Sequence, residues 1–248
     1  MTRSGTAGPD RAEAPTPGHG LTGVADAGAF LARLVRLDPV APVRLRPADA
    51  AGRVALWARL PWQVLVVRTV DGGPADGGST DVTVAASELL AELERGGAAL
   101  PARRDAQWRW PLPPPRSRPV EALPAAELWR IAGAAAGTLR AASEHGVAGR
   151  AVGQRALRDA LLDHVAVLVT PDNPPGPPVE VSQRLVQGLI RMGFLGTADR
   201  PAGPPAEAGA VQVRVAGRWV GLVGPYGAAW LQKATDLAVT PLATRPNG

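Results

Sequence analysis

The chain has 248 residues, which is enough for one large domain or two small ones. It contains no cysteine, which excludes disulfides, thiolate zinc sites and cysteine nucleophiles. Residues 1–100 hold 10 arginines and 11 acidic residues, whereas residues 101–248 hold 17 basic and 11 acidic residues. The positive charge therefore belongs to the second part of the chain, where we expect an anionic partner.

The N-terminal region predicts a disordered tail over residues 1–24, because Gly, Pro, Thr and Ala dominate it. It lacks the apolar segment of a secretory signal, and no run approaches the roughly 18 apolar residues of a membrane span. We therefore expect a cytoplasmic protein with no membrane partner.

Residues 25–100 predict a small α+β domain. A helix follows Asp26, with Ala27, Phe30 and Leu34 on one face. The alternation between residues 43 and 84 predicts an antiparallel sheet of three or four strands, and a second helix follows it.

Residues 101–122 form a Pro/Arg/Trp-rich segment that predicts an extended linker. Trp108, Arg109 and Trp110 are candidate partner-binding residues, because Trp and Arg dominate binding hot spots. The alternative is that both indoles pack back onto a neighbouring domain.

Residues 123–248 predict a mainly helical domain with a C-terminal β-hairpin. Its first helix carries rows of Ala and Gly that allow close helix packing, and Leu157 and Leu161 lie on the expected buried side of the second. Asp159, Asp163 and His164 could bind a metal or perform acid-base chemistry, but the expected alternative is a solvated surface cluster. No catalytic motif, metal site or cofactor site is predicted, and the chain is expected not to be an enzyme.

The clearest pattern lies between Val181 and Val223. An amphipathic helix there is expected to place Gln183, Arg184, Gln187 and Arg191 on its outer face. A hairpin follows, with a predicted two-residue turn at Ala216 and Gly217 that would pair Arg214 with Trp219. Arg and Gln side chains suit the edges of guanine and adenine.

The helix with its closing Gly-Phe-Leu, followed by an Arg-tipped hairpin, resembles the recognition helix and wing of a winged-helix DNA-binding domain. This resemblance implies double-stranded DNA as a partner. The candidate contacts are the four helix residues above, with Arg214 and Arg218 as phosphate contacts of the wing. The chain as a whole also resembles an uncharacterised type of actinobacterial protein, which implies no activity.

The sequence thus predicts an α+β protein: a small antiparallel sheet with flanking helices, then a mainly helical unit with a β-hairpin. The leading hypothesis is a non-enzymatic nucleic-acid-binding or regulatory protein that uses the winged-helix-like unit. The alternative is a protein-interaction or assembly module that uses the Trp/Pro/Arg linker to bind a protein partner.

Overall fold

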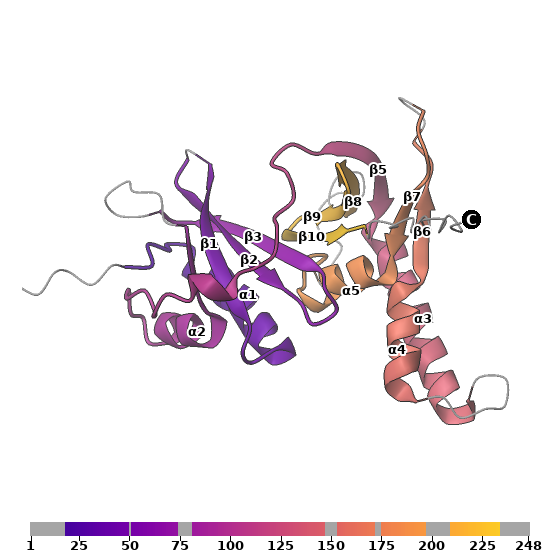
Figure 1. Cartoon of the computed structure of the whole chain (residues 1–248), viewed down its shortest axis with the longest axis horizontal. Coiled ribbons are helices and arrows are strands. Elements are labelled where there is room, and N and C mark those ends of the chain that lie inside the picture. Colours follow the sequence, from indigo (N-terminus) through magenta and orange to yellow (C-terminus); the bar gives the residue numbers. More distant parts are fainter. Residues whose placement is uncertain are drawn as a thin grey trace, which may run out of the picture.

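An antiparallel sheet of eight strands runs through the described part of the protein (Figure 1). The computed structural model describes residues 18–49, 51–73, 81–146, 153–171, 175–196 and 209–233. In spatial order the strands of the sheet are β4 (Val82–Ala85), β1 (Pro42–Asp49), β2 (Arg53–Arg59), β3 (Leu65–Asp71), β10 (Gly227–Gln232), β9 (Trp219–Gly224), β8 (Ala210–Ala216) and β5 (Arg118–Pro124). This sheet and its helices confirm the predicted α+β class.

The centre of the sheet joins strands from the two predicted domains. Strand β3 pairs with β10, with Val66 opposite Ala229. The hairpin β8–β9, expected as an appendage of a helical unit, is therefore an integral part of the sheet. The division into domains at residues 25–100 and 123–248 stays a prediction.

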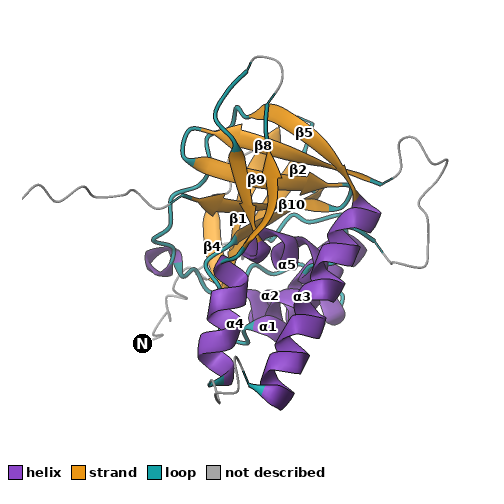
Figure 2. Ribbon diagram, turned by 90° about the vertical axis from the view of Figure 1, so that its right-hand side faces the viewer, coloured by secondary structure: helices purple, strands orange, loops and turns teal. Residues whose placement is uncertain are grey.

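Three helices cover one face of the sheet: α1 (Val24–Leu37), α2 (Ala86–Glu94) and α5 (Gln183–Arg191). Figure 2 shows the helices gathered on one side of the strands. Helix α1 buries the apolar face predicted for it, and Phe30 stacks on Phe194 with ring centroids 6.4 Å apart. Helix α5 lies close against the sheet, because a Cβ atom at Gly188 would be 3.1 Å from Val64 and 3.3 Å from Ala229. The main core lies between these helices and the sheet.

Residues 101–117, here called the strap, connect the two edges of the sheet. Beside the edge strand β4 the strap forms the short 3-10 helix η1 (Asp105–Gln107), and the backbone of Thr83 bonds to Arg104 and to the Asp105 carboxylate. At the opposite edge the chain continues into β5. The predicted linker is thus extended, but it is held against the sheet, and its last residues form a strand.

The strap covers the outer face of the sheet, opposite the helices. A second apolar cluster forms there and contains five of the seven tryptophans: Trp57, Trp108, Trp110, Trp219 and Trp230. The Trp108 indole donates a hydrogen bond to the backbone oxygen of Trp110, and the two rings meet edge to face at 5.4 Å. The indoles therefore complete an apolar layer rather than standing free in solvent.

Residues 18–24 of the predicted N-terminal tail contact the rest of the fold. His19 is buried, accepts a hydrogen bond from Leu21 N at Nδ1 and donates from Nε2 to Gly97 O. Leu21 is also buried in the core, which offsets the entropy of ordering this segment. The rest of the predicted tail, residues 1–17, lies outside the described residues.

Two helices and a ribbon project from this body (Figure 1). They are α3 (Ala125–His145), α4 (Gln154–Asp163) and the two-stranded sheet of β6 (Val165–Val169) and β7 (Val179–Ser182). In α3 only Leu128 and Ala132 are buried, and no residue with a described side chain is buried in α4. No helix in the described part of the chain has the length and apolarity needed to cross a membrane.

Candidate functional site

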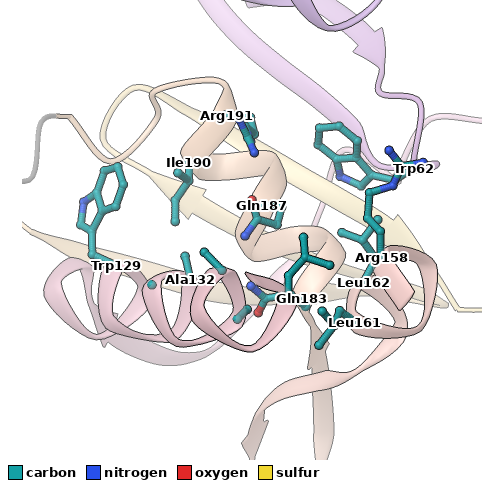
Figure 3. Close-up of a pocket in the computed structure, with 14 residues that line it drawn as sticks. Trp62, Trp129, Ala132, Arg158, Leu161, Leu162, Gln183, Gln187, Ile190 and Arg191 are labelled. Carbon is teal, nitrogen blue, oxygen red and sulfur yellow. The ribbon is translucent and has the colours of Figure 1, made fainter. Parts of the chain in front are cut away.

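A groove of about 590 Å³ lies between α3, α4 and α5. Figure 3 shows Trp129 at one end of it and Trp62 at the other, with α5 between them. The volume falls in the range of protein sites that bind small molecules or short segments, roughly 300–1,000 Å³. The lining residues are Trp62, Trp129, Ala132, Gly133, Ala135, Ala136, Leu139, Arg158, Leu161, Leu162, Gln183, Gln187, Ile190 and Arg191.

The groove exists because small residues of α3 face larger ones of α4 and α5. Ala132, Gly133, Ala135 and Ala136 form one wall and cannot fill the space in front of them. Their row was expected to allow close helix packing, but the helices stand apart over part of it. Leu161 was expected to be buried and is only half-buried in the opposite wall. An apolar surface is therefore left open between the helices.

Gln183 is the one buried polar side chain of the groove, with 4% of its surface exposed. Its Nε2 atom has no hydrogen-bond partner among the described residues. A buried N–H group without an acceptor costs about 1–3 kcal/mol. Gln183 therefore carries an unpaired buried donor in the wall of the groove.

Arg184 ties three elements together beside the groove. Its guanidinium donates to the Asp163 carboxylate at 2.6 Å and to the Trp62 backbone oxygen at 2.8 Å. The Trp62 indole donates in return to the Arg184 backbone oxygen at 3.1 Å. The hydrogen bond from Arg184 holds the pKa of Asp163 below its usual range. These contacts fix one end of the groove.

The charged side chains that line the groove are cationic. Among the described residues they are Arg158 and Arg191, and both are exposed. The carboxylate of Asp159 lies 3.9 Å from the Arg158 guanidinium. Arg191 forms no ion pair within the described segments. An apolar surface with two cationic side chains and amide donors favours an apolar ligand that carries negative charge.

The residues predicted to contact DNA do not form one surface. Gln183, Gln187 and Arg191 line the groove, whereas Arg184 is held by Asp163 and Trp62. Arg214 lies in β8 and donates to the side chain and backbone oxygens of Ser117 in the strap, at 2.8 and 2.7 Å. Arg218 lies in the β8–β9 turn, where its backbone oxygen accepts a hydrogen bond from Lys233.

The prediction of nucleic-acid binding by a winged-helix-like unit is therefore wrong. A recognition helix must be exposed beside its wing, but α5 packs against β9 and β10, and the hairpin lies inside the eight-stranded sheet. The pattern misled because a helix packed on one face of a sheet has the same apolar periodicity as a recognition helix packed on its own small domain.

The hairpin also differs by one residue from its predicted register. The two-residue turn is Gly217–Arg218, with Ala216 opposite Trp219. Gly217 takes the positive φ of 58° that this turn requires and that glycine adopts without strain. Arg214 is consequently opposite Gly221, not Trp219.

The candidate partner-binding residues Trp108, Arg109 and Trp110 lie on the strap. Both indoles are half-buried, with the guanidinium of Arg44 5.7 Å from the Trp108 ring and that of Arg59 5.0 Å from the Trp110 ring. Arg109 is exposed. Packing of the indoles onto the sheet was the alternative expectation, and a partner-binding role for the three residues stays a prediction.

The acidic cluster of α4 is divided between separate contacts. Asp159 is 3.9 Å from Arg155 and Arg158, Asp163 bonds to Arg184, and His164 follows the end of the helix. Among the described residues no group of three or more His, Asp or Glu side chains is placed to hold a metal ion.

Two family models match the chain. Residues 112–236 match a domain of unknown function, DUF8185, and residues 20–110 match a second domain of unknown function, DUF8010. The first match covers half of the chain, so the chain belongs to the DUF8185 family. The boundary between the two matches falls within the strap. No curated protein matches the chain.

The solved structures similar to the chain are DNA polymerase sliding clamps, not winged-helix domains. The clamp from Caulobacter crescentus is 10% identical, with a TM-score of 0.46, and 84% of this chain aligns with 63% of the clamp. Two clamps from Pseudomonas aeruginosa are 10% and 11% identical, with TM-scores of 0.42 and 0.44. Both alignments cover 89% of this chain, and they cover 67% of the first clamp and 66% of the second. The chain thus spans less than two thirds of the Caulobacter clamp, and at these TM-scores the likeness carries no argument about function.

Proposed function

We propose that this chain is a protein-interaction module that binds a partner protein in the groove between α3, α4 and α5. The groove leaves Leu139, Leu161 and Leu162 only partly covered, although each could be buried by a partner. Burial of apolar area is the main favourable contribution to most protein association. This uncovered apolar surface on projecting helices is the observation that carries the proposal.

The architecture supports the same proposal. Helix α3 has 21 residues but buries only two of them, and its other contacts with the core come from the partly buried Ala125, Trp129 and Ile131. Apolar surface that contributes little to folding and is rimmed by polar residues marks an interaction site. A partner helix laid in the groove would complete a small bundle with α3, α4 and α5, a common mode of peptide recognition.

Photo-crosslinking in the source cells tests the proposal. A benzophenone amino acid would replace Ala136, which lines the groove, and in a matched control it would replace Ala134. The two positions lie about 200° apart around α3, and both are exposed. We expect a discrete crosslinked protein at Ala136 and none at Ala134.

The crosslink must also depend on the groove itself. Adding Gln183→Leu and Ile190→Glu within the groove should remove the crosslink, while Arg109→Ala on the strap should not. Identical crosslinks at Ala134 and Ala136, or none at either position, would refute a groove-dependent interaction.

A further inference from the structure

The chemistry of the groove restricts the kind of partner segment that fits it. Of its fourteen lining residues, ten are apolar or glycine, two are Gln and two are Arg. None of them carries a negative charge. A partner segment must therefore offer apolar side chains to the walls and must not place cations beside Arg158 and Arg191.

The two arginines come from different helices, Arg158 from α4 and Arg191 from α5. Figure 3 shows them with the groove residues of α5 and α4. Neither has a carboxylate within 3.5 Å among the described residues, whereas Arg184 nearby is bonded to Asp163 at 2.6 Å. Asp163 is thus bonded to Arg184, and Asp159 is no closer than 3.9 Å to Arg158, so Arg158 and Arg191 can still pair with carboxylates of a ligand.

Gln183 supplies an independent observation. Gln183 lines the groove, and its Nε2 is buried and lacks an acceptor within the described part of the chain. Most buried polar atoms in proteins are hydrogen-bonded, so an unpaired donor in a groove points to an oxygen of a ligand. Carbonyl and carboxylate oxygens both satisfy this requirement.

We infer that the groove binds a short acidic, amphipathic segment of the partner protein. Its apolar side chains lie between α3 and α4, its Asp or Glu side chains pair with Arg158 and Arg191, and one of its oxygens accepts from Gln183 Nε2. This inference rests on the proposed function and adds the chemistry of the partner to it. The length of the groove walls limits the segment: α4 has 10 residues and α5 has nine, so each spans about 15 Å.

Selection from a random-peptide phage library on the immobilised full chain tests this inference. We expect the enriched peptides to combine large apolar residues with Asp or Glu. Synthetic copies of these peptides should bind the wild type and the Ala134→Trp variant with the same affinity. The Ala136→Trp variant, in which the new side chain fills the groove, should bind them about tenfold or more weakly. Thermal unfolding of each variant checks that it is folded.

Charge reversal gives the sharpest outcome. The double variant Arg158→Glu/Arg191→Glu should bind the acidic peptides about 10- to 100-fold more weakly, and a new selection on it should enrich Lys and Arg. Both side chains are exposed, so the fold should tolerate the change. Unchanged affinity and unchanged selection would overturn the inference.

Gln183→Leu separates a binding role from a structural one. The change removes an unpaired buried amide, so the melting temperature of the free chain should stay the same or rise, while peptide affinity falls about tenfold. A lower melting temperature with unchanged affinity would show that Gln183 is structural and would contradict its role as a ligand donor.

Other occupants give distinct results. Groove-dependent peptides that are neutral or basic overturn the inference but leave the protein-interaction role standing. A dimer that Ala136→Trp dissociates, or a co-purified acyl carboxylate detected by native mass spectrometry, would also overturn it. Failure of the proposed function is recognised separately, by the absence of a crosslinked partner at Ala136.

Discussion

The protein contains two pairs of helices that differ in what they cover. Helices α1 and α2 lie on the sheet and bury seven residues between them, including Phe30, Leu34 and Leu89. Helices α3 and α4 are longer in total, yet they bury only Leu128 and Ala132 within the described residues. The first pair completes the core, and the second holds an apolar groove open. Amphipathic helices of similar appearance in sequence therefore serve stability in one pair and, on our proposal, recognition in the other.

The largest expected contrast is between matched leucines of the two pairs. Leu34→Ala in α1 removes a fully buried side chain and should lower the free energy of unfolding by about 2–5 kcal/mol. Leu139→Ala in α3 removes a half-buried one and should cost about 1 kcal/mol or less. Denaturant unfolding of both variants measures this difference, and equal losses would show that α3 belongs to the core after all.

The next effect concerns the outer face. Trp110→Ala removes a half-buried indole that packs from the strap onto the sheet beside the Arg59 guanidinium, and it should destabilise the fold by about 2 kcal/mol. Its exposed neighbour serves as the control, since Arg109→Ala should change stability by less than about 0.5 kcal/mol. If Trp110→Ala left thermal unfolding unchanged, the strap would not contribute to the fold, and its tryptophans would become available to a partner.

A smaller effect depends on pH. Hydrogen bonding from Arg44, with a further contribution from Arg46, holds the pKa of Asp81 below its usual range, and Asp81 is at 2.6 Å from Arg44 and 3.0 Å from Arg46. A pKa lowered by folding adds stability above the unfolded value, near 3.8, and this contribution is lost as pH falls through the folded value.

Asp81→Asn should therefore cost about 0.5–1 kcal/mol at pH 7, and the difference from the wild type should shrink below about pH 4. Urea unfolding at several pH values measures it. Asp159→Asn is the control in the projecting pair, because the nearest guanidiniums are 3.9 Å away. A difference that grows toward low pH would contradict the assigned ion pair.

The smallest effect has the opposite sign. A Cβ atom added at Gly137 of α3 would meet no atom of the described residues within 4 Å, so Gly137→Ala should raise stability by roughly 0.5–1 kcal/mol through helix propensity alone. Gly188→Ala in α5 should not raise stability, because the added Cβ atom would press on Val64 and Ala229. Thermal unfolding of both variants tests whether α3 is open where α5 is packed.

Much of the fold could be predicted from residue patterns. The buried faces of α1 and α5 follow the helical spacing of Phe30, Leu34, Leu185 and Leu189. The continuous sheet could not be predicted, because the pairing of β3 with β10 joins residues more than 150 positions apart and leaves no local signal. The same long-range pairing turned an expected wing into a central hairpin.

The groove was only partly predictable. The sequence identified Gln183, Gln187 and Arg191 as part of the polar face of one helix, and these three residues line the groove. Trp62 and Trp129 were missed, since they come from a turn after β2 and from α3 and meet only in the folded chain. The Ala-rich row of α3 was the available signal, but it is compatible both with close helix packing and with a groove.

Hydrogen exchange of the full chain, free and with a peptide selected on it, tests the central claim most directly. Our account predicts that the peptide slows amide exchange in α3, α4 and α5, with α1, α2 and the strap unchanged. In the free chain α3 and α4 should exchange faster than α1 and α2. Slowing confined to the strap and the outer face of the sheet, with no change in α3 and α4, would contradict the assignment of the groove as the binding surface.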